Sequence, residues 1–132
     1  MTQSLEDYLE MVSFLSDEGE VRVTDIAARL RVRKPSVLAA LKTLEEQGFL
    51  EHKRYGTVSL TEGGMHKAKE IRERHDFLTA FLRDIVKVDS ETAERDACKM
   101  EHLLSEVTIR KMKTLVEAKA ESAHAVRRKQ GI

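Results

Sequence analysis

The chain has 132 residues, of which 41% are hydrophobic and 35% are charged, with one cysteine and a formal net charge of +0. This length can hold one compact core or two small modules, and the composition is typical of a helix-rich soluble protein. One cysteine excludes an internal disulfide framework. The lack of a long apolar run argues against a membrane span or a signal peptide, so we expect a cytoplasmic protein.

The neutral net charge hides a basic segment. Residues 22–54 contain eight Lys or Arg residues and four acidic residues, a local net charge of +4. The rest of the chain must therefore carry the compensating negative charge. This asymmetry predicts one module that faces an anion and another module with a different task.

The first predicted element is a helix over residues 4–16, because its apolar side chains recur at helical spacing. Asp7 and Glu10 lie on the neighbouring face, about one turn apart. On residue pattern alone, this acidic pair is typical of an ordinary solvated face. Val21 and Val23 predict a very short strand. The apolar stripe of the helix consists of Leu5, Tyr8, Leu9, Val12 and Leu15.

Two short helices follow, joined by a tight turn. Thr24 is a good N-cap for a helix over residues 25–30, and Pro35 suits the first position of a helix that reaches about Gln47. Gly48 is a natural stop just past its end. The pair predicts a helix-turn-helix, although a helical hairpin that binds nothing has the same pattern. The predicted buried stripe of the second helix is Val37, Leu38, Leu41 and Leu44.

Residues 49–60 predict a basic β-hairpin with its turn at Tyr55-Gly56. A basic hairpin directly after a helix-turn-helix is a wing, so the combination predicts binding to double-stranded DNA. Basic side chains before the second helix and near the hairpin tip are expected to contact phosphate, and small or polar side chains on the exposed helix face can approach base edges. The candidate DNA-binding residues are Arg33, Lys34, Ser36, Lys42, Thr43, Lys53 and Arg54.

The second half predicts further helices. Thr61 is expected to cap a long helix over about residues 62–86, with the stripe Ala68, Ile71, His75, Leu78, Leu82 and Ile85. A helix over about residues 91–104 would bury Ala93, Ala97, Met100, Leu103 and Leu104, and Ser105 would cap a last helix. These helices carry more apolar surface than a small hairpin can bury in itself, so we expect a homodimer.

One stretch of the predicted fifth helix brings three metal-binding side-chain types together. Cys98, Glu101 and His102 fall within about 100° of helical arc. A thiolate, a carboxylate and an imidazole together suit a first-row divalent ion. The alternative is a small buried Cys beside a solvated Glu-His pair. A lone His75 in an apolar seam is likewise more often a core residue than a ligand.

The order of these elements resembles the diphtheria-toxin-repressor-like, metal-dependent transcriptional regulators over nearly the whole chain. Residues 96–106, Asp-Ala-Cys-Lys-Met-Glu-His-Leu-Leu-Ser-Glu, resemble the ligand helix of the iron-dependent members. Residues 6–10, Glu-Asp-Tyr-Leu-Glu, resemble the first-helix ligand segment of the manganese transport regulators. Residues 60–64 are similar to the Leu-Thr-x-x-Gly that follows the wing in this family. The chain length resembles that of the short manganese-type members.

The resemblance implies a mostly α fold, with a winged helix-turn-helix domain over residues 1–61 and a helical metal-binding and dimerisation domain over residues 62–132. It also implies a hybrid metal site. The position of Asp7 is Met in iron-type members, and the position of Cys98 is Glu in manganese-type members. Two iron-type ancillary positions are here Glu94 and Thr79, which favours a manganese-like pair of ions. The implied metal ligands are Asp7, Glu10, His75, Cys98, Glu101 and His102.

The sequence therefore predicts a metal-activated repressor of metal-uptake genes that binds operator DNA as a homodimer and is not an enzyme. The expected cofactor is a divalent transition metal, with manganese favoured and iron or zinc as alternatives, because the Cys98 thiolate is softer than a carboxylate. A dimeric winged-helix regulator without metal control is the alternative. A metallohydrolase fits less well, since the chain offers no phosphate loop, no nucleophile turn and no base outside the ligand set.

Overall fold

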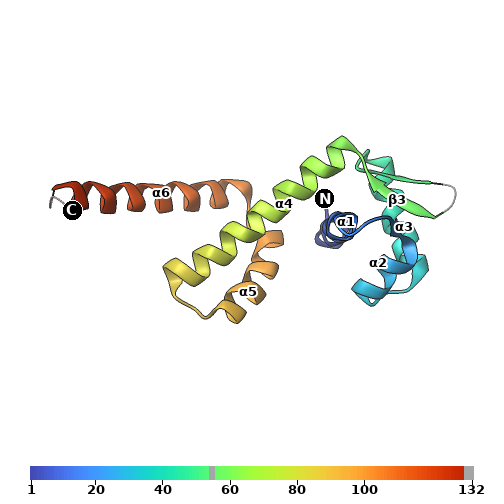
Figure 1. Ribbon diagram of the computed structural model, residues 1–132, viewed down its shortest axis with the longest axis horizontal. Helices are drawn as coiled ribbons and strands as arrows, with labels where there is room; N and C mark the ends of the chain where they lie inside the picture. The colour runs from blue at the N-terminus through green and yellow to red at the C-terminus, as the bar shows by residue number, and fades with distance from the viewer. Residues whose placement is uncertain (54–55, 130–132) are drawn as a thin grey trace. The chain divides into compact units, whose positions relative to one another are not determined.

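The structure is a computed structural model that describes residues 1–53 and 56–129, with side chains described as far as residue 122. The chain forms two compact units, the first from Met1 to His102 and the second from Leu103 onward. Helices α1 to α5 and a three-stranded sheet belong to the first unit, whereas helix α6 (Glu106–Lys129) belongs to the second (Figure 1). Among the described residues, no helix is long and apolar enough to cross a membrane.

Helix α1 (Gln3–Ser16) begins where the Thr2 hydroxyl accepts a hydrogen bond from the Leu5 N–H at 3.2 Å. Its apolar stripe is buried as the spacing predicts except at Leu5, which is half-buried, and the helix packs against α2, α3 and α4. Such burial stabilises a fold by about 1.5–3 kcal/mol for each large aliphatic side chain. The stripe therefore makes α1 the centre of the first unit. Its buried residues are Tyr8, Leu9, Val12 and Leu15.

The helix-turn-helix consists of α2 (Val23–Leu30) and α3 (Lys34–Glu46), preceded by the strand β1 (Val21–Arg22). The predicted N-cap at Thr24 is wrong. The Asp25 carboxylate accepts the Arg22 N–H at 3.0 Å, so the helix already begins at Val23 and this residue is not in the strand. Pro35 lies in the first turn of α3, and Gly48 follows its end with a φ of +82°.

One predicted core residue of α3 is on the surface. Leu38 is 45% exposed, whereas Val37, Leu41 and Leu44 are buried as predicted. Successive residues of a helix are about 100° apart, so the residue next to Val37 is turned away from the face on which Val37 packs. Leu38 therefore lies on the flank of the exposed face of α3.

The wing is confirmed as a hairpin of β2 (Leu50–His52) and β3 (Thr57–Leu60). The sheet order is β1-β3-β2, with both pairs antiparallel. Val58 is the central partner, because it pairs with Val21 on one side and with His52 on the other. Arg54 and Tyr55, which the sequence places at the hairpin turn, lie outside the described residues.

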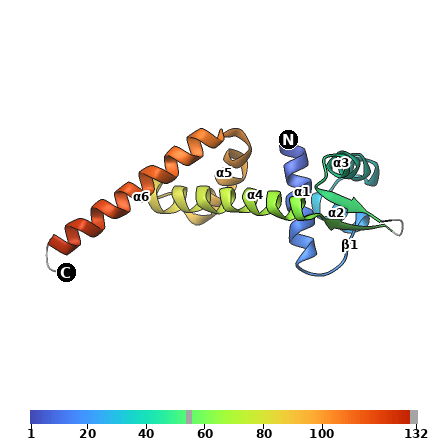
Figure 2. The same cartoon turned by 90° about the horizontal axis from the view of Figure 1, so that it is seen from above.

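Helix α4 (Glu62–Ala80) leads from the sheet past α1 to α5, as Figure 2 shows. The Thr61 hydroxyl accepts the Gly64 N–H at 3.0 Å and donates to the Gly48 carbonyl at 2.6 Å, so the predicted cap is confirmed. A Cβ at Gly64 would lie 1.8 Å from the Phe49 carbonyl oxygen, which leaves room for glycine alone. The start of α4 is thereby locked to the wing, and the Ala68 side chain joins the core.

The predicted long helix continues as a π-helical segment, η1 (Phe81–Val86), followed by α5 (Ser90–Leu103). Ile85 is 39% exposed and Leu103 is 78% exposed, so both were wrongly predicted as buried. The π-helical turn changes the angular spacing before Ile85. In α5 the buried position belongs to Glu101, and Leu103 is about 200° further around the helix. The fold class is otherwise as predicted, mostly α with a small wing sheet.

Candidate metal centre

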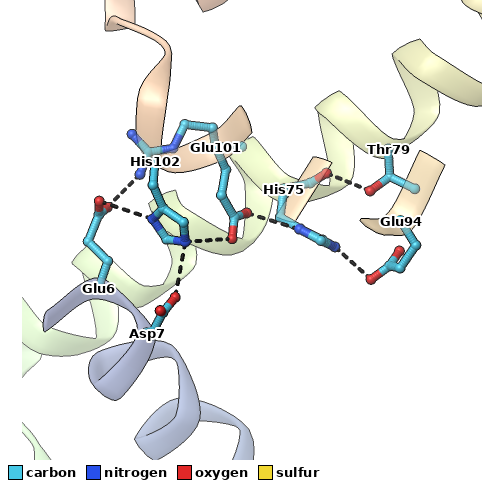
Figure 3. Close-up of polar contacts among 8 residues, drawn as sticks. Glu6, Asp7, His75, Thr79, Glu94, Glu101 and His102 are labelled. Carbon is cyan, nitrogen blue, oxygen red and sulfur yellow. Dashed lines mark hydrogen bonds and ion pairs between the residues drawn. The ribbon is translucent and has the colours of Figure 1, made fainter. Parts of the chain in front are cut away.

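Four of the six predicted metal ligands lie in contact with one another where α1, α4 and α5 meet (Figure 3). His102 Nε2 is 3.0 Å from Asp7 Oδ1 and 3.1 Å from Glu101 Oε1. His75 Nδ1 is 3.0 Å from Glu101 Oε2. The Glu101 carboxylate therefore lies between the two imidazoles, with Asp7 beside the second one.

Glu101 owes its position to the helical period of α5. Ala93, Ala97 and Glu101 are spaced four residues apart and form the buried face of the helix. Glu101 is 0% exposed, a rare environment for a carboxylate unless donors satisfy its oxygens. Among the described residues, however, neither Glu101 oxygen accepts a hydrogen bond. A charged group buried without donors calls for another positive partner.

The contacts around Glu101 are short but lack hydrogen-bond geometry. His75 Nδ1 and His102 Nε2 are buried and, within the described part of the chain, have no hydrogen-bond partner despite the 3.0–3.1 Å distances to carboxylate oxygens. Glu10 Oε2 is a further buried atom without a hydrogen-bond partner among the described residues. These atoms are therefore free to serve as ligands.

Two outer carboxylates explain why these nitrogens are free. His75 Nε2 lies 2.8 Å from Glu94 Oε1, and His102 Nδ1 lies 3.3 Å from Glu6 Oε1. An ionised carboxylate only accepts hydrogen bonds, so a proton on the outer nitrogen of each ring would satisfy these two hydrogen bonds. The inner nitrogen lone pairs then face the oxygens of Glu101. Two lone pairs in contact repel each other, whereas a cation between them would attract both.

The electrostatics of the cluster favour added positive charge. Burial, followed by the charge of Glu10, raises the pKa of Glu101 to about 7. Burial also raises the pKa of Asp7 and of Glu10. Burial alone would lower the pKa of His75, but the hydrogen bond to Glu94 and the nearby acids raise it overall. Carboxylate and imidazole donors in such a place fit a divalent manganese, iron or zinc ion.

Cys98 differs from the other predicted ligands. It is a free cysteine with an exposed side chain on α5. Partial burial raises the pKa of its thiol, and the charges of Glu101 and Glu10 raise it further. In the part of the chain that the structure describes, no three His, Cys, Asp or Glu side chains are already arranged to hold a metal ion. The set of six ligands therefore stays a prediction.

The two ancillary positions differ in their contacts, because Glu94 Oε1 lies 2.8 Å from the predicted ligand His75 whereas Thr79 does not face the cluster with its hydroxyl. The Thr79 hydroxyl donates to the backbone carbonyl of His75 at 2.9 Å, so it is engaged within its own helix. Sequence reasoning missed Glu6 and its ion-pair partner Arg74. Glu6 lies one turn before Glu10 at the edge of the apolar stripe of α1, but nothing in the sequence pairs it with Arg74.

The candidate DNA-binding residues are mostly on the surface of the helix-turn-helix and wing. Arg33, Lys34, Ser36, Lys42 and Lys53 are exposed, and the Thr43 hydroxyl donates to the Ala39 carbonyl at 3.2 Å. Within the described residues none of the four cations is in an ion pair. Two other arginines of this region are in ion pairs, Arg22 with Glu20 at 4.0 Å and Arg29 with Glu18 at 3.5 Å. Arg54 lies outside the described residues. The unpaired cations remain available for phosphate.

The fold and the site together define a winged-helix protein with a buried cluster of potential metal ligands. Two family models match the chain. Residues 1–58 match the iron-dependent repressor N-terminal DNA-binding domain. Residues 61–127 match the iron-dependent repressor metal-binding and dimerisation domain. The chain therefore belongs to the iron-dependent repressor family, whose members bind DNA and metal and form dimers.

Individual relatives agree with this assignment. The chain is 43% identical to the transcriptional regulator MntR of Escherichia coli O6:H1 over 106 residues, which cover 80% of the chain and 68% of that protein. It is 33% identical to an HTH-type transcriptional regulator of Methanocaldococcus jannaschii over 119 residues, covering 89% and 95%. The solved manganese regulator SloR has the same fold, with a TM-score of 0.73 at 23% identity, over 89% of this chain and 55% of that one. The resemblance drawn from the sequence is confirmed.

Proposed function

We propose that this chain is a cytoplasmic, homodimeric repressor that a divalent metal ion, with manganese favoured, activates to bind the operators of metal-uptake genes. The observation that carries the proposal is Glu101. This carboxylate is 0% exposed, accepts no hydrogen bond from the described residues, and faces an imidazole nitrogen on each side. A bound metal would supply the positive charge that this arrangement lacks.

The proposed ligands are Asp7, Glu10, His75, Cys98, Glu101 and His102. These ligands come from helices that differ in whether they pack against the helix-turn-helix. Asp7 and Glu10 are on α1, which packs against both helices of the helix-turn-helix, whereas Glu101 and His102 are on α5. Without a metal, repulsion among the carboxylates destabilises the contact between α1 and α5. A cation that binds ligands from both α1 and α5 therefore has a higher affinity for the arrangement in which these helices are held together. Such a difference in affinity between two arrangements is what coupling to DNA binding requires.

On the DNA side, the proposal places α3 in the major groove and the wing beside the backbone. Arg33, Lys34, Lys53 and Arg54 would contact phosphate and position the dimer, while Ser36, Lys42 and Thr43 would approach base edges. We assign no catalytic step to the chain, because the acids and histidines of the cluster are assigned as metal ligands and the relatives that it matches are transcriptional regulators.

The test of the proposal is operator binding by purified, metal-free protein to which manganese, iron, zinc or cobalt is added separately. A randomised duplex library, selected with metal present, supplies the operator. We expect at least one metal to raise operator affinity by about 5- to 150-fold, the usual range of an allosteric coupling. Equal affinity with every metal and with chelator would instead support a winged-helix regulator without metal control.

Cys98 is expected to bias metal choice. The Cys98→Ala variant should bind zinc and iron more weakly, and manganese nearly as well, because the thiolate is the softest predicted ligand. Folding should change little, since the side chain is exposed. Calorimetric titration of each metal into both proteins measures this, with the exposed neighbour Lys99→Ala as the control. If zinc affinity is the same in Cys98→Ala and wild type, Cys98 is not a ligand.

A further inference from the structure

A line of buried polar side chains leads from the candidate metal centre into the interface between α1 and α4. Arg74 Nη2 forms an ion pair with Glu6 Oε2 at 2.5 Å, and Glu6 Oε1 lies 3.3 Å from His102 Nδ1. The side chains of Arg74, Glu6 and His102 are 17%, 10% and 1% exposed. Glu6 therefore uses one oxygen for each neighbour, and little water competes for either contact.

The chemistry of the three groups assigns the protons. A guanidinium only donates and an ionised carboxylate only accepts. Arg74 therefore occupies one oxygen of Glu6, and a proton on His102 Nδ1 satisfies the other oxygen, whereas the short contacts of Nε2 with Asp7 and Glu101 lack hydrogen-bond geometry. The opposite ring nitrogen, Nε2, is then left with its lone pair. This is the nitrogen that faces Asp7 Oδ1 and Glu101 Oε1 (Figure 3).

We propose that Glu6, held by Arg74, is a positioning residue that fixes His102 as the Nδ1–H tautomer and so keeps its Nε2 lone pair available to the metal. The proposal rests on the proposed function, because it takes His102 as a ligand. Its structural part concerns the metal-free protein and can be tested there. Carboxylates that orient ligand histidines in this way commonly change metal affinity by 10- to 100-fold when they are removed.

The Glu6→Gln substitution has an unusually definite expected result. Glutamine has one oxygen and one NH₂ group in place of two oxygens. Arg74 can only donate, so it requires the amide oxygen, and the NH₂ group is left to face His102. That group donates to Nδ1, which forces the proton of the ring onto Nε2. His102 should therefore change tautomer, and its inner nitrogen should lose the lone pair that a metal needs.

A second substitution should reverse this effect. In the Glu6→Gln/Arg74→Met variant nothing holds the amide oxygen, so the amide can turn and accept the proton of His102 Nδ1. Methionine replaces much of the apolar stem of arginine and neither donates nor carries charge. The double variant should recover the Nδ1–H tautomer and most of the lost metal affinity. A residue with only a structural role would show two additive losses instead.

The experiment uses metal-free full-length protein labelled with ¹⁵N at histidine. The ring signals of His102 are assigned as those that are missing from the spectrum of His102→Gln. Long-range ¹H–¹⁵N spectra then give the tautomer in wild type, Glu6→Gln and the double variant. Calorimetric titration with manganese then gives the affinities. We expect the Nδ1–H tautomer in wild type and in the double variant, and the Nε2–H tautomer in Glu6→Gln. Manganese affinity should fall 10- to 100-fold in Glu6→Gln and recover in the double variant. Glu73→Gln, on the exposed face of α4, is the control.

The outcomes separate this proposal from the proposed function. An Nε2–H tautomer in wild type overturns the proposal by itself. The proposal can therefore be refuted even if the Glu6→Gln variant does not fold. A tautomer change without a change in manganese affinity also overturns it. If wild type shows the Nδ1–H tautomer and the variants follow the expected order, but no metal changes operator affinity, the positioning role stands and the proposed function fails.

Discussion

The Glu101→Gln variant is expected to lose metal-dependent operator binding almost completely. Both oxygens of this carboxylate face imidazole nitrogens, so a single substitution removes negative charge from both sides of the candidate centre. The whole metal-induced gain in operator affinity, about 5- to 150-fold, should disappear. Fluorescence anisotropy with labelled operator, with and without manganese, measures this gain directly.

The same substitution should stabilise the metal-free protein. The amide is nearly identical in shape to the carboxylate, carries no charge, and offers an NH₂ group to one of the two nitrogen lone pairs that have no partner among the described residues. Leaving such a buried group unsatisfied typically costs about 1–3 kcal/mol, so the free energy of unfolding in chelator should rise by an amount of that order. Denaturant unfolding of the metal-free protein provides the measurement.

A matched control separates this effect from a general change of charge on α5. Glu91 lies on the same helix, its side chain is 83% exposed, and it forms an ion pair with Arg95 at 3.2 Å. Glu91→Gln should alter neither the response to metal nor the unfolding free energy by a measurable amount. If Glu101→Gln responds to manganese as wild type does, Glu101 is a buried structural acid and the metal site lies elsewhere.

Local patterns in the sequence predicted most of the fold. The apolar spacing of α1, the cap at Thr61 and the glycine stop after α3 each depend on a few neighbouring residues, and each is present. The errors arose where several readings of a local pattern compete, as at Thr24, where the Asp25 carboxylate accepts the Arg22 N–H and starts α2 earlier. Leu38 and Leu103 fit a helical stripe equally well on paper, but other residues occupy the buried positions.

The candidate site shows the same division. The spacing of Glu101 and His102 predicted that they share one region of α5, and the family resemblance added Asp7 and His75. Neither source indicated Glu6, because its importance depends on Arg74, which is 68 residues away in the chain. A pairing of this kind follows from how α1 packs against α4, and no local pattern contains it.

The Asp7→Ala variant is the prediction that tests the joint between α1 and α5. Asp7 is on the helix that packs against the helix-turn-helix, and its Oδ1 lies 3.0 Å from His102 Nε2 on α5. Dimerisation and weak, non-specific DNA binding should remain, since neither the basic face of α3 nor the wing changes. Most of the metal-induced gain in operator affinity should be lost. Glu91→Ala, at an exposed acid of α5, makes the same change of charge away from the DNA-binding helices and serves as the control.

Thermodynamic reciprocity gives this prediction a second and independent readout. If metal tightens operator binding by some factor, operator DNA must tighten metal binding by the same factor. Manganese titrations of wild type with and without operator should therefore differ by the measured gain, whereas those of Asp7→Ala should nearly coincide. Equal gains in the two proteins would mean that Asp7 is not a ligand and does not couple α1 to the metal. A metal bound by α4 and α5 alone would stabilise the fold, but its binding would not be coupled to the position of the DNA-binding helices.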